Sequence, residues 1–233
     1  MYPVGGCRAV KNGDVTVNLK VRGAAREYLE AILVALIIAV VLRTFVVQAY
    51  RIPSESMENT LITGDFILVN KFIYHFREPE PGDILVFQYP LNPSKDYVKR
   101  CVAIEGQMVE IKDKQVFVNN RPVLEAKGVH HTDPTFIPPD LGNRDNFGPV
   151  IVPPGCVFVL GDNRDDSRDS RVWGFLDKEL IHGKASFVYW SWAPDPNAPR
   201  WESPYIIPIL TIPFYNLMHF PNRVRWDRLG NLL

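Results

Sequence analysis

Short apolar runs separated by turn-forming residues make up most of the chain after Tyr50, and they limit its fold more than any other feature. The runs are rich in Val, Ile, Phe and Tyr, whereas Gly, Pro, Asn and Asp lie between them, a pattern typical of strands. No helical periodicity of any length is found there. The expected strands lie within DFILVNKFIY, DILVFQYP, YVKRCVAI, MVEIKDKQVFVNNRPV, CVFVLGD and KASFVYW. In VFVNNRPV the pair AsnAsn predicts a hairpin turn. Many short strands and few helices predict a mainly β domain, built as a barrel or sandwich, over residues 49–192.

The strand pattern is lost between residues 126 and 149, where Pro, Gly, Asn and His are frequent. This composition predicts a surface insertion in the β domain. His130 and His131 lie in the insertion, and a histidine pair in such a loop is more typical of exposed side chains than of a metal or catalytic pair. The other histidines lie in no recognisable nucleophile setting, which argues against a Ser/His/Asp triad.

The stretch LEAILVALIIAVVLRTFVV, Leu29–Val47, is apolar except for Glu30 and Arg43. A spanning helix needs about 20 mainly apolar residues, and charges near its ends can extend to the headgroups. We therefore expect one transmembrane helix over residues 28–48, preceded by a tail of residues 1–27.

Two other interpretations of this stretch stay open: a buried core helix and the apolar region of a cleaved signal peptide. The tail before it is long for a signal peptide, which favours an uncleaved anchor. Basic residues exceed acidic ones before the span; they include Lys11, Lys20, Arg22 and Arg26. The positive-inside rule then predicts a cytoplasmic N-terminus, with everything after Tyr50 on the trans side of a cell membrane.

Overall charge and the cysteines exclude two kinds of site. Lys and Arg total 26, as do Asp and Glu, so no net field indicates a nucleic-acid partner. The three cysteines, Cys7, Cys101 and Cys156, show no metal-ligand spacing. Pairing of Cys101 with Cys156 stays open, although both lie in strand-like runs where a free cysteine packs as a small apolar residue.

A serine and a lysine far apart in sequence form a candidate catalytic pair. Ser56 lies in PSESMENTL, a few residues after the apolar stretch, and a serine nucleophile needs a base. Lys99 lies in DYVKRCVAI, where strand alternation places it on the same face as Tyr97 and Cys101, with Arg100 on the other. Burial on that face would lower the lysine pKa towards neutrality. A third polar block, GDNRDDSRDSRVWG, lies between apolar runs at residues 161–174.

Taken in order, the apolar stretch, PSESMENTL, GDFILVNKF, GDILVFQYP, DYVKRCVAIEGQ and GDNRDDSRDSRVWG resemble the type I signal peptidases over residues 28–192. The resemblance implies a membrane-bound serine endopeptidase with Ser56 as nucleophile and Lys99 as general base. It also implies that the Ser54 hydroxyl and the Ser56 backbone N–H stabilise the oxyanion. Ser167 would orient the Lys99 amine, and Asp169 and Arg171 would support that side of the site. The sequence departs from the family pattern at three positions without a catalytic role, namely Asn59 and Glu105, commonly proline, and Val172, commonly aromatic.

The expected reaction is removal of N-terminal signal peptides from exported preproteins at a lipid bilayer, with no cofactor. The resemblance further implies small substrate residues at the −1 and −3 positions, in shallow apolar pockets that an extended peptide reaches by adding a strand. Candidate lining residues are Ile52, Pro53, Met57 and Tyr97. Two alternatives are a self-cleaving repressor-type Ser/Lys protease and a catalytically dead, membrane-anchored binding paralogue.

The GDNRDDSRDSR block has two other interpretations. Alternating oxygen ligands resemble the start of a calcium loop, but Arg168 and Gly174 lie where such a loop needs glycine and a bidentate glutamate, so we expect no metal. A polar turn that only stabilises the fold is the remaining alternative to a salt-bridged part of the active site.

Residues 193–233 form a predicted extension rich in Pro and aromatic residues. Its prolines exclude one regular helix over residues 193–221, and its apolar stretch YIIPILTIPFYNLMHF is short for a second span, which stays an alternative. Its aromatic residues are expected to cover the β domain or lie among lipid headgroups; they are Trp201, Tyr205, Phe214, Tyr215 and Phe220. The segment Arg223–Gly230 is predicted to be the last strand of the domain, on the trans side.

Overall fold

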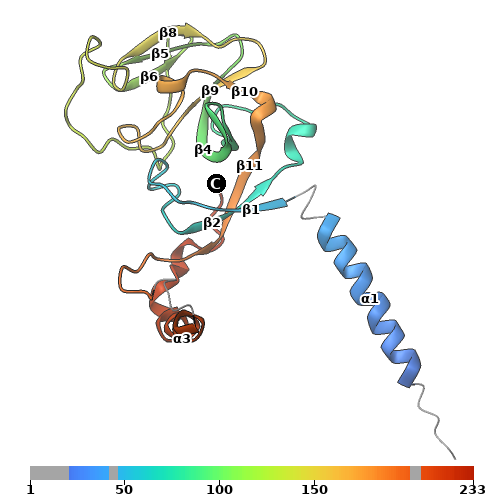
Figure 1. Cartoon of the computed structure of the whole chain (residues 1–233). Coiled ribbons are helices and arrows are strands. Elements are labelled where there is room, and N and C mark those ends of the chain that lie inside the picture. Colours follow the sequence, from blue (N-terminus) through green and yellow to red (C-terminus); the bar gives the residue numbers. More distant parts are fainter. Residues whose placement is uncertain (1–20, 42–46, 200–205) are drawn as a thin grey trace, which may run out of the picture. The chain divides into compact units, whose positions relative to one another are not determined.

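The computed structural model describes residues 21–41, 47–199 and 206–233 (Figure 1). The chain divides into two compact units, and the boundary in the sequence lies between Val41 and Leu42. The described part of the first unit is helix α1 (Val21–Val41), in which Arg26 and Glu30 form an ion pair of 2.7 Å. None of the helices in the described ranges is long and apolar enough to cross a membrane. The predicted span also includes residues 42–46, which lie outside those ranges.

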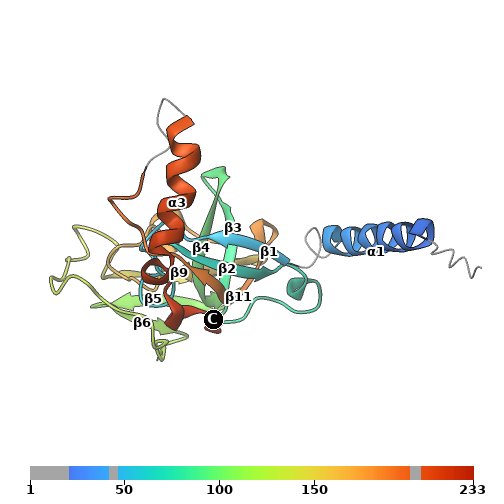
Figure 2. The same ribbon diagram turned by 90° about the horizontal axis from the view of Figure 1, so that it is seen from below.

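The second unit is built from antiparallel strands, which confirms the mainly β prediction. A seven-stranded sheet has the order β1-β2-β11-β3-β4-β9-β10, and a four-stranded sheet has the order β7-β6-β5-β8. The strands are β1 (Val47–Arg51), β2 (Asp65–Asn70), β3 (Ile84–Tyr89), β4 (Asn92–Ile104), β5 (Met108–Lys112), β6 (Gln115–Val118), β7 (Arg121–Pro122), β8 (Phe147–Ile151), β9 (Cys156–Leu160), β10 (Leu176–Asp177) and β11 (Ile181–Ser191). Strands β5, β6 and β8 lie apart from β1 and β2, with β4 and β9 between them (Figures 1 and 2).

Strand alternation and turn chemistry explain these elements. In β2, buried and half-buried residues alternate along the strand, because one face covers the core. Between β6 and β7, Asn119 and Asn120 have φ angles of 51° and 62°. Two left-handed residues in a two-residue loop fit the twist of a hairpin, so the predicted AsnAsn turn is confirmed.

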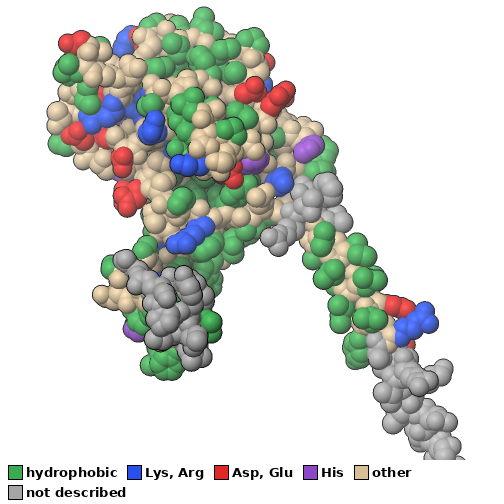
Figure 3. Space-filling view, in the orientation of Figure 1, with side chains coloured by type: hydrophobic (Ala, Val, Ile, Leu, Met, Phe, Trp, Pro, Cys, Tyr) green, Lys and Arg blue, Asp and Glu red, His purple; other side chains and the backbone are tan. Residues whose placement is uncertain are grey.

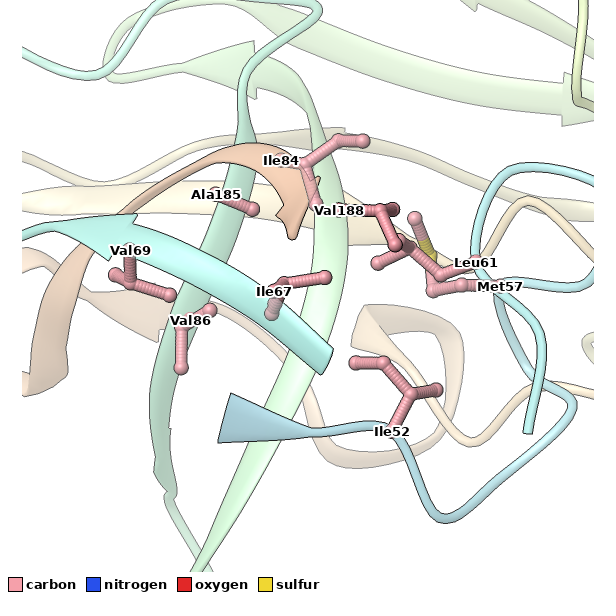
Figure 4. Packing of buried hydrophobic residues seen from close by; sticks show 9 residues of the cluster. All are labelled: Ile52, Met57, Leu61, Ile67, Val69, Ile84, Val86, Ala185 and Val188. Atoms are coloured by element: carbon pink, nitrogen blue, oxygen red, sulfur yellow. The ribbon is translucent and has the colours of Figure 1, made fainter. Parts of the chain in front are cut away.

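One buried cluster joins the large sheet to the loop that follows β1 (Figure 4). Ile67 of β2, Ile84 of β3 and Val188 of β11 pack there with Met57 and Leu61 from the loop. Met57 is 2% exposed and Leu61 is fully buried, so burial of two large side chains holds this loop against the sheet. Another cluster fills the space between β4, β9 and the small sheet.

The predicted insertion at residues 126–149 is mostly irregular, although its last residues begin β8. Parts of the insertion pack against the rest of the domain and are not exposed. Asp145 is fully buried, and His130 forms an isolated bridge with Asn163. His131 is exposed, as expected. The side chain of His130 is only 20% exposed, so the expectation is wrong for that residue.

The C-terminal extension differs from its prediction in two ways. Helix α3 (Ile206–Arg223) was not expected, because the segment contains prolines. Pro208 lies in the first turn, where backbone N–H groups have no partner within the helix, and Pro213 and Pro221 are accommodated farther along. The expected last strand is also absent: Trp226–Arg228 is a 3-10 helix, and only isolated bridges join Val224 to Trp192 and Leu232 to Phe187. Trp201 and Tyr205 lie outside the described residues.

Cys101 and Cys156 are both free. Cys101 lies in the core at 1% exposure, and burial raises the pKa of its thiol to about 12. The inference that it packs as a small apolar residue is therefore confirmed. Cys7 lies outside the described residues.

Candidate active site

Ser56 lies in a tight turn between β1 and β2. The amide of Leu61 donates to the carbonyl oxygen of Met57 at 2.7 Å, and both side chains are buried. Asn59 has a φ of 69°, a left-handed conformation that asparagine adopts more readily than most residues. The buried side chains of Met57 and Leu61 fix the turn, and Ser56, directly before Met57, is left partly accessible.

Lys99 reaches this serine from the middle of the large sheet. It lies in β4, paired with Leu85 of β3, and is only 3% exposed. Its Nζ donates to Ser56 Oγ at 2.5 Å, and the same Nζ lies 5.6 Å from the centre of the Tyr97 ring. The fold thus brings together the serine and lysine that the sequence singled out.

The environment of Lys99 favours its neutral form. Burial lowers the pKa of the Lys99 amine from 10.5 to about 8. Asp169 and Asp162 oppose this shift because a negative charge favours the protonated amine, whereas the positive charge of Arg171 adds to it. With this pKa roughly a tenth of the amine is neutral at pH 7, far more than for a free lysine, and this fraction can act as a base.

Ser54 lies beside the same pair. Its Oγ is 3.5 Å from Ser56 Oγ, and the side chain is exposed. A hydroxyl at this place can donate to an oxygen that develops negative charge next to Ser56.

The block at residues 161–174 forms a buried polar network behind the pair. The two carboxylate oxygens of Asp169 each accept from the Arg171 guanidinium at 2.8 Å, and Asp169 also accepts from the Gly161 amide at 3.1 Å. The backbone N–H of Asn163 donates to the Ser56 carbonyl oxygen at 3.1 Å. The block is thus bonded directly to the nucleophile turn, and every charge of the Asp169–Arg171 pair has a partner.

Asp162 is a residue of this network that the sequence did not single out. It is fully buried and accepts from Nε of Arg100 at 2.8 Å and from Thr60 Oγ1 at 2.5 Å. Arg100 directly follows Lys99 in β4, while Thr60 lies in the nucleophile turn. Asp162 therefore ties the strand of the base to the loop of the nucleophile. The only sequence signal for it was its position in the GDN triplet.

Ser167 is partly buried near the Ser56 turn, and its Oγ does not make the predicted bond to Lys99. Its Oγ has no hydrogen-bond partner among the described residues. It lies close to Gly161, since a Cβ added to that glycine would contact Ser167 Oγ and would lie 2.5 Å from the Ser56 carbonyl oxygen. A buried hydroxyl without a partner is uncommon and needs an explanation.

A cavity of about 340 Å³ opens beside Ser56 and Lys99. It is lined by Tyr50, Arg51, Ile52, Pro53, Ser54, Glu55, Ser56, Met57, Asp96, Tyr97, Val98, Lys99, Asp166 and Arg168. The four expected substrate-contacting residues, Ile52, Pro53, Met57 and Tyr97, are all among them. The cavity lies between the segment that continues β1 and the first half of β4, so two extended segments border it.

Within the described ranges, no group of three or more His, Cys, Asp or Glu side chains is arranged to hold a metal ion. Three of the four acidic side chains of the 161–174 block instead pair with cations of the protein. Asp162 pairs with Arg100, Asp165 with Lys114 and Asp169 with Arg171.

The β domain and the hydrogen-bonded serine and buried lysine define a candidate site of the serine peptidase class. Comparison with known proteins gives the family. Residues 25–190 match the family model described as signal peptidase, peptidase S26. The signal peptidase I of Aquifex aeolicus is 34% identical over 219 residues, covering 71% of this chain and 84% of that protein.

A probable signal peptidase I-1 of Synechocystis is 38% identical over 183 residues, covering 76% of this chain and 85% of that protein. The signal peptidase I of Pseudomonas aeruginosa is 35% identical over 213 residues, covering 73% and 74%. The chain belongs to the signal peptidase family S26 and is a serine endopeptidase.

Proposed function

We propose that this endopeptidase removes N-terminal signal peptides from exported preproteins, with Ser56 as nucleophile and Lys99 as general base. The observation that carries the proposal is the 2.5 Å contact between Lys99 Nζ and Ser56 Oγ, made by a lysine that is 3% exposed. Family membership and the names of the relatives support signal peptides as the substrate class.

In the proposed mechanism, neutral Lys99 accepts the Ser56 proton while Oγ attacks the scissile carbonyl. The tetrahedral oxyanion accepts hydrogen bonds from the Ser54 hydroxyl and the Ser56 amide. The protonated Lys99 then gives its proton to the leaving amine. A water molecule that transfers a proton to the same lysine hydrolyses the acyl-enzyme.

Three residues are proposed to position the base. Asp169 and Arg171 hold the 161–174 block, and the Ser167 hydroxyl orients the Lys99 amine when substrate is bound. The unpartnered, buried hydroxyl of Ser167 supports this role, because a small rearrangement on binding would give it a partner. Ser167→Ala is expected to lower kcat less than Ser56→Ala, since it removes an orienting bond and no reacting atom.

The substrate is proposed to bind as an extended strand in the cavity. Strand β1 is an edge of the large sheet, and its continuation borders the cavity opposite Tyr97 and Val98. Backbone hydrogen bonds to these segments would hold the peptide. Ile52, Pro53, Met57 and Tyr97 supply apolar contacts that suit small residues at the −1 and −3 positions.

The predicted span, residues 28–48, is proposed to anchor the enzyme after a cytoplasmic tail of residues 1–27. Its last two residues, Val47 and Gln48, already belong to β1, so the membrane-spanning segment ends before Val47. The β domain, residues 49–192, and the extension, residues 193–233, would then lie on the trans side, where exported preproteins emerge. The apolar run that begins at Ala31 and the basic residues before it support this topology.

The test is cleavage of a signal-bearing preprotein by the reconstituted full chain, with sequencing of the new N-terminus. The wild type should cut at the signal-peptide boundary. Ser56→Ala and Lys99→Arg should both be inactive, because a guanidinium stays protonated and cannot accept the serine proton. His131→Ala is the matched control and should stay close to wild type.

Two results would contradict the proposal. If Ser56→Ala cleaves at a rate near the wild type, Ser56 is not the nucleophile. If the wild type binds the preprotein but never cleaves it, the chain is the catalytically dead paralogue.

A further inference from the structure

Helix α3 has an unusual distribution of side chains. A surface helix normally directs polar residues to solvent and apolar residues to the core. In α3 the only Asp, Glu, Lys or Arg is Arg223, the last residue. The helix therefore has no charged side chain along the rest of its length.

One face of α3 packs on the end of the β domain and on the loop that follows it. The Phe220 ring centre lies 5.8 Å from that of Trp190, and the Tyr215 hydroxyl donates to Asp195, in the loop, at 2.6 Å. The guanidinium of Arg223 lies 4.6 Å from the Trp192 ring centre. Because this face is occupied, the helix can offer only its other face to a partner.

The other face is apolar and exposed. Ile209, Phe214, Leu217 and Met218 are each more than half exposed, and Leu217 reaches 72%. Hydrophobic side chains are visible around the lower edge of α3 in Figure 3. Near the end of the helix, Trp226 is 58% exposed and contacts Phe220. A continuous apolar surface of this kind marks an interaction site.

We propose that the exposed face of α3, formed by Ile209, Phe214, Leu217 and Met218, lies in the interfacial layer of a lipid bilayer. An in-plane helix buries its apolar face about 5–10 Å below the headgroups. Trp226 and Arg223 lie at the C-terminal end, where an indole ring and a cation suit the headgroup region. This attachment is additional to the proposed anchor and does not depend on peptidase activity.

The shape and charge of α3 favour lipid over the two other occupants. A bound peptide helix or strand needs a groove or a free sheet edge, whereas this face is the convex side of a single helix. A second copy would have to cover the same apolar face, and α3 offers no charged side chain along that face to set a pairing register. An uncharged, convex surface with aromatic rings at one end fits the boundary between headgroups and acyl chains.

The position of α3 connects this surface to the candidate active site. A second cavity, of about 280 Å³, lies between α3 and the sheet and is lined by Arg51, Phe66, Trp192, Ile212 and Asn216, among others. Arg51 also lines the cavity beside Ser56. A bilayer contact at α3 would therefore hold the substrate cavity close to the membrane surface.

The test measures lipid contact in the full chain reconstituted into phosphatidylcholine/phosphatidylglycerol vesicles. Cys7 and Cys156 are replaced by serine, and Cys101 is kept because it is buried and does not react. An environment-sensitive fluorophore is then attached at Leu217→Cys. The matched control carries it at Leu141→Cys in the insertion, where the native side chain is 75% exposed.

Lipids with a nitroxide on the acyl chain should quench most of the fluorescence at position 217 and little at position 141. A repeat at Met218→Cys guards against a local effect of one label. The same quenching should occur in a Ser56→Ala background, so failure of the proposed catalytic mechanism would leave this result unchanged.

Three outcomes would overturn the proposal. The label at position 217 could be as open to aqueous quenchers as the label at position 141. It could be shielded from water without lipid quenching, in proportion to protein density in the vesicles, which would indicate a second copy. It could become shielded only after a signal peptide is added, which would indicate a peptide site.

Discussion

Replacing Lys99 by methionine should stabilise the folded protein near neutral pH. Burial lowers the pKa of this amine from 10.5 to about 8, so folding disfavours its protonated form. The difference of about 2.5 pKa units corresponds to about 3 kcal/mol, at roughly 1.36 kcal/mol per unit. Lys99 is only 3% exposed, so solvent does not screen most of this cost. Methionine has similar length and carries no charge to desolvate.

The advantage of Lys99→Met should depend on pH with a definite sign. Above about pH 10.5 the lysine is neutral in both the folded and the unfolded chain, so folding does not have to bury a protonated amine. Between about 10.5 and about 8 the unfolded chain binds the proton first, so the wild type loses stability as the pH falls. Below about pH 8 both states carry the proton, and the loss of stability from burying the charged amine no longer changes with pH.

The assay is urea unfolding of both proteins at a series of pH values from neutral to above 10.5, followed by tryptophan fluorescence. The free energy of unfolding of Lys99→Met should exceed that of the wild type by up to about 3 kcal/mol at pH 7. This difference should shrink as the pH rises. A variant that is less stable than the wild type at pH 7, or a difference that does not change with pH, would refute the argument that Lys99 is a desolvated base.

Three further substitutions test other parts of the site. Asp169→Asn should lower the free energy of unfolding by about 3–5 kcal/mol, because it leaves the buried guanidinium of Arg171 without its carboxylate; calorimetry or urea unfolding checks this. Ser54→Ala should lower kcat by about 10²–10³-fold with a smaller change in KM, as expected for loss of one oxyanion donor; steady-state cleavage of a signal-peptide substrate checks this. Gly161→Ala should displace the Ser56 turn, since its Cβ would lie 2.5 Å from the Ser56 carbonyl oxygen, and a loss of about 1–3 kcal/mol in stability together with reduced activity is expected.

The sequence predicted the β domain well because most strands are local patterns. Alternation in β2 and the Asn119–Asn120 turn depend on neighbouring residues alone, so they can be recognised without the fold. The order of the strands within the sheet, in contrast, cannot be recognised from neighbouring residues. Strand β11 lies between β2 and β3, although more than 90 residues separate it from β3 (Ile84–Tyr89 to Ile181–Ser191), and no local pattern encodes that pairing.

Helix α3 and the final segment were mispredicted for identifiable reasons. The prolines of α3 predict a break in a helix, and two of them, Pro213 and Pro221, do lie inside it. Pro208 is in the first turn, where it costs no hydrogen bond. The closing segment alternates like a strand. Its arginines instead bind the domain, since Arg228 pairs with the buried Asp65, and this long-range contact favours a 3-10 turn over a strand.

Ser56 and Lys99 were predicted from residue chemistry and from the ordered blocks that resemble a family. The role of Asp162 was not, because it depends on contacts with Thr60 and Arg100, which lie far from it in sequence. The unpartnered state of Ser167 was likewise invisible in the sequence, since burial and hydrogen bonding follow from the packing of the whole block.

The central claim is that a buried, neutral Lys99 activates Ser56, and the pH dependence of kcat/KM for signal-peptide cleavage tests it most directly. In the free enzyme the amine must lose its proton before it can accept one from serine. We therefore expect kcat/KM to rise with pH through an apparent pKa of about 8, the value to which burial lowers the pKa of Lys99. A rise centred near roughly 10, the ordinary lysine value, would contradict a buried lysine base.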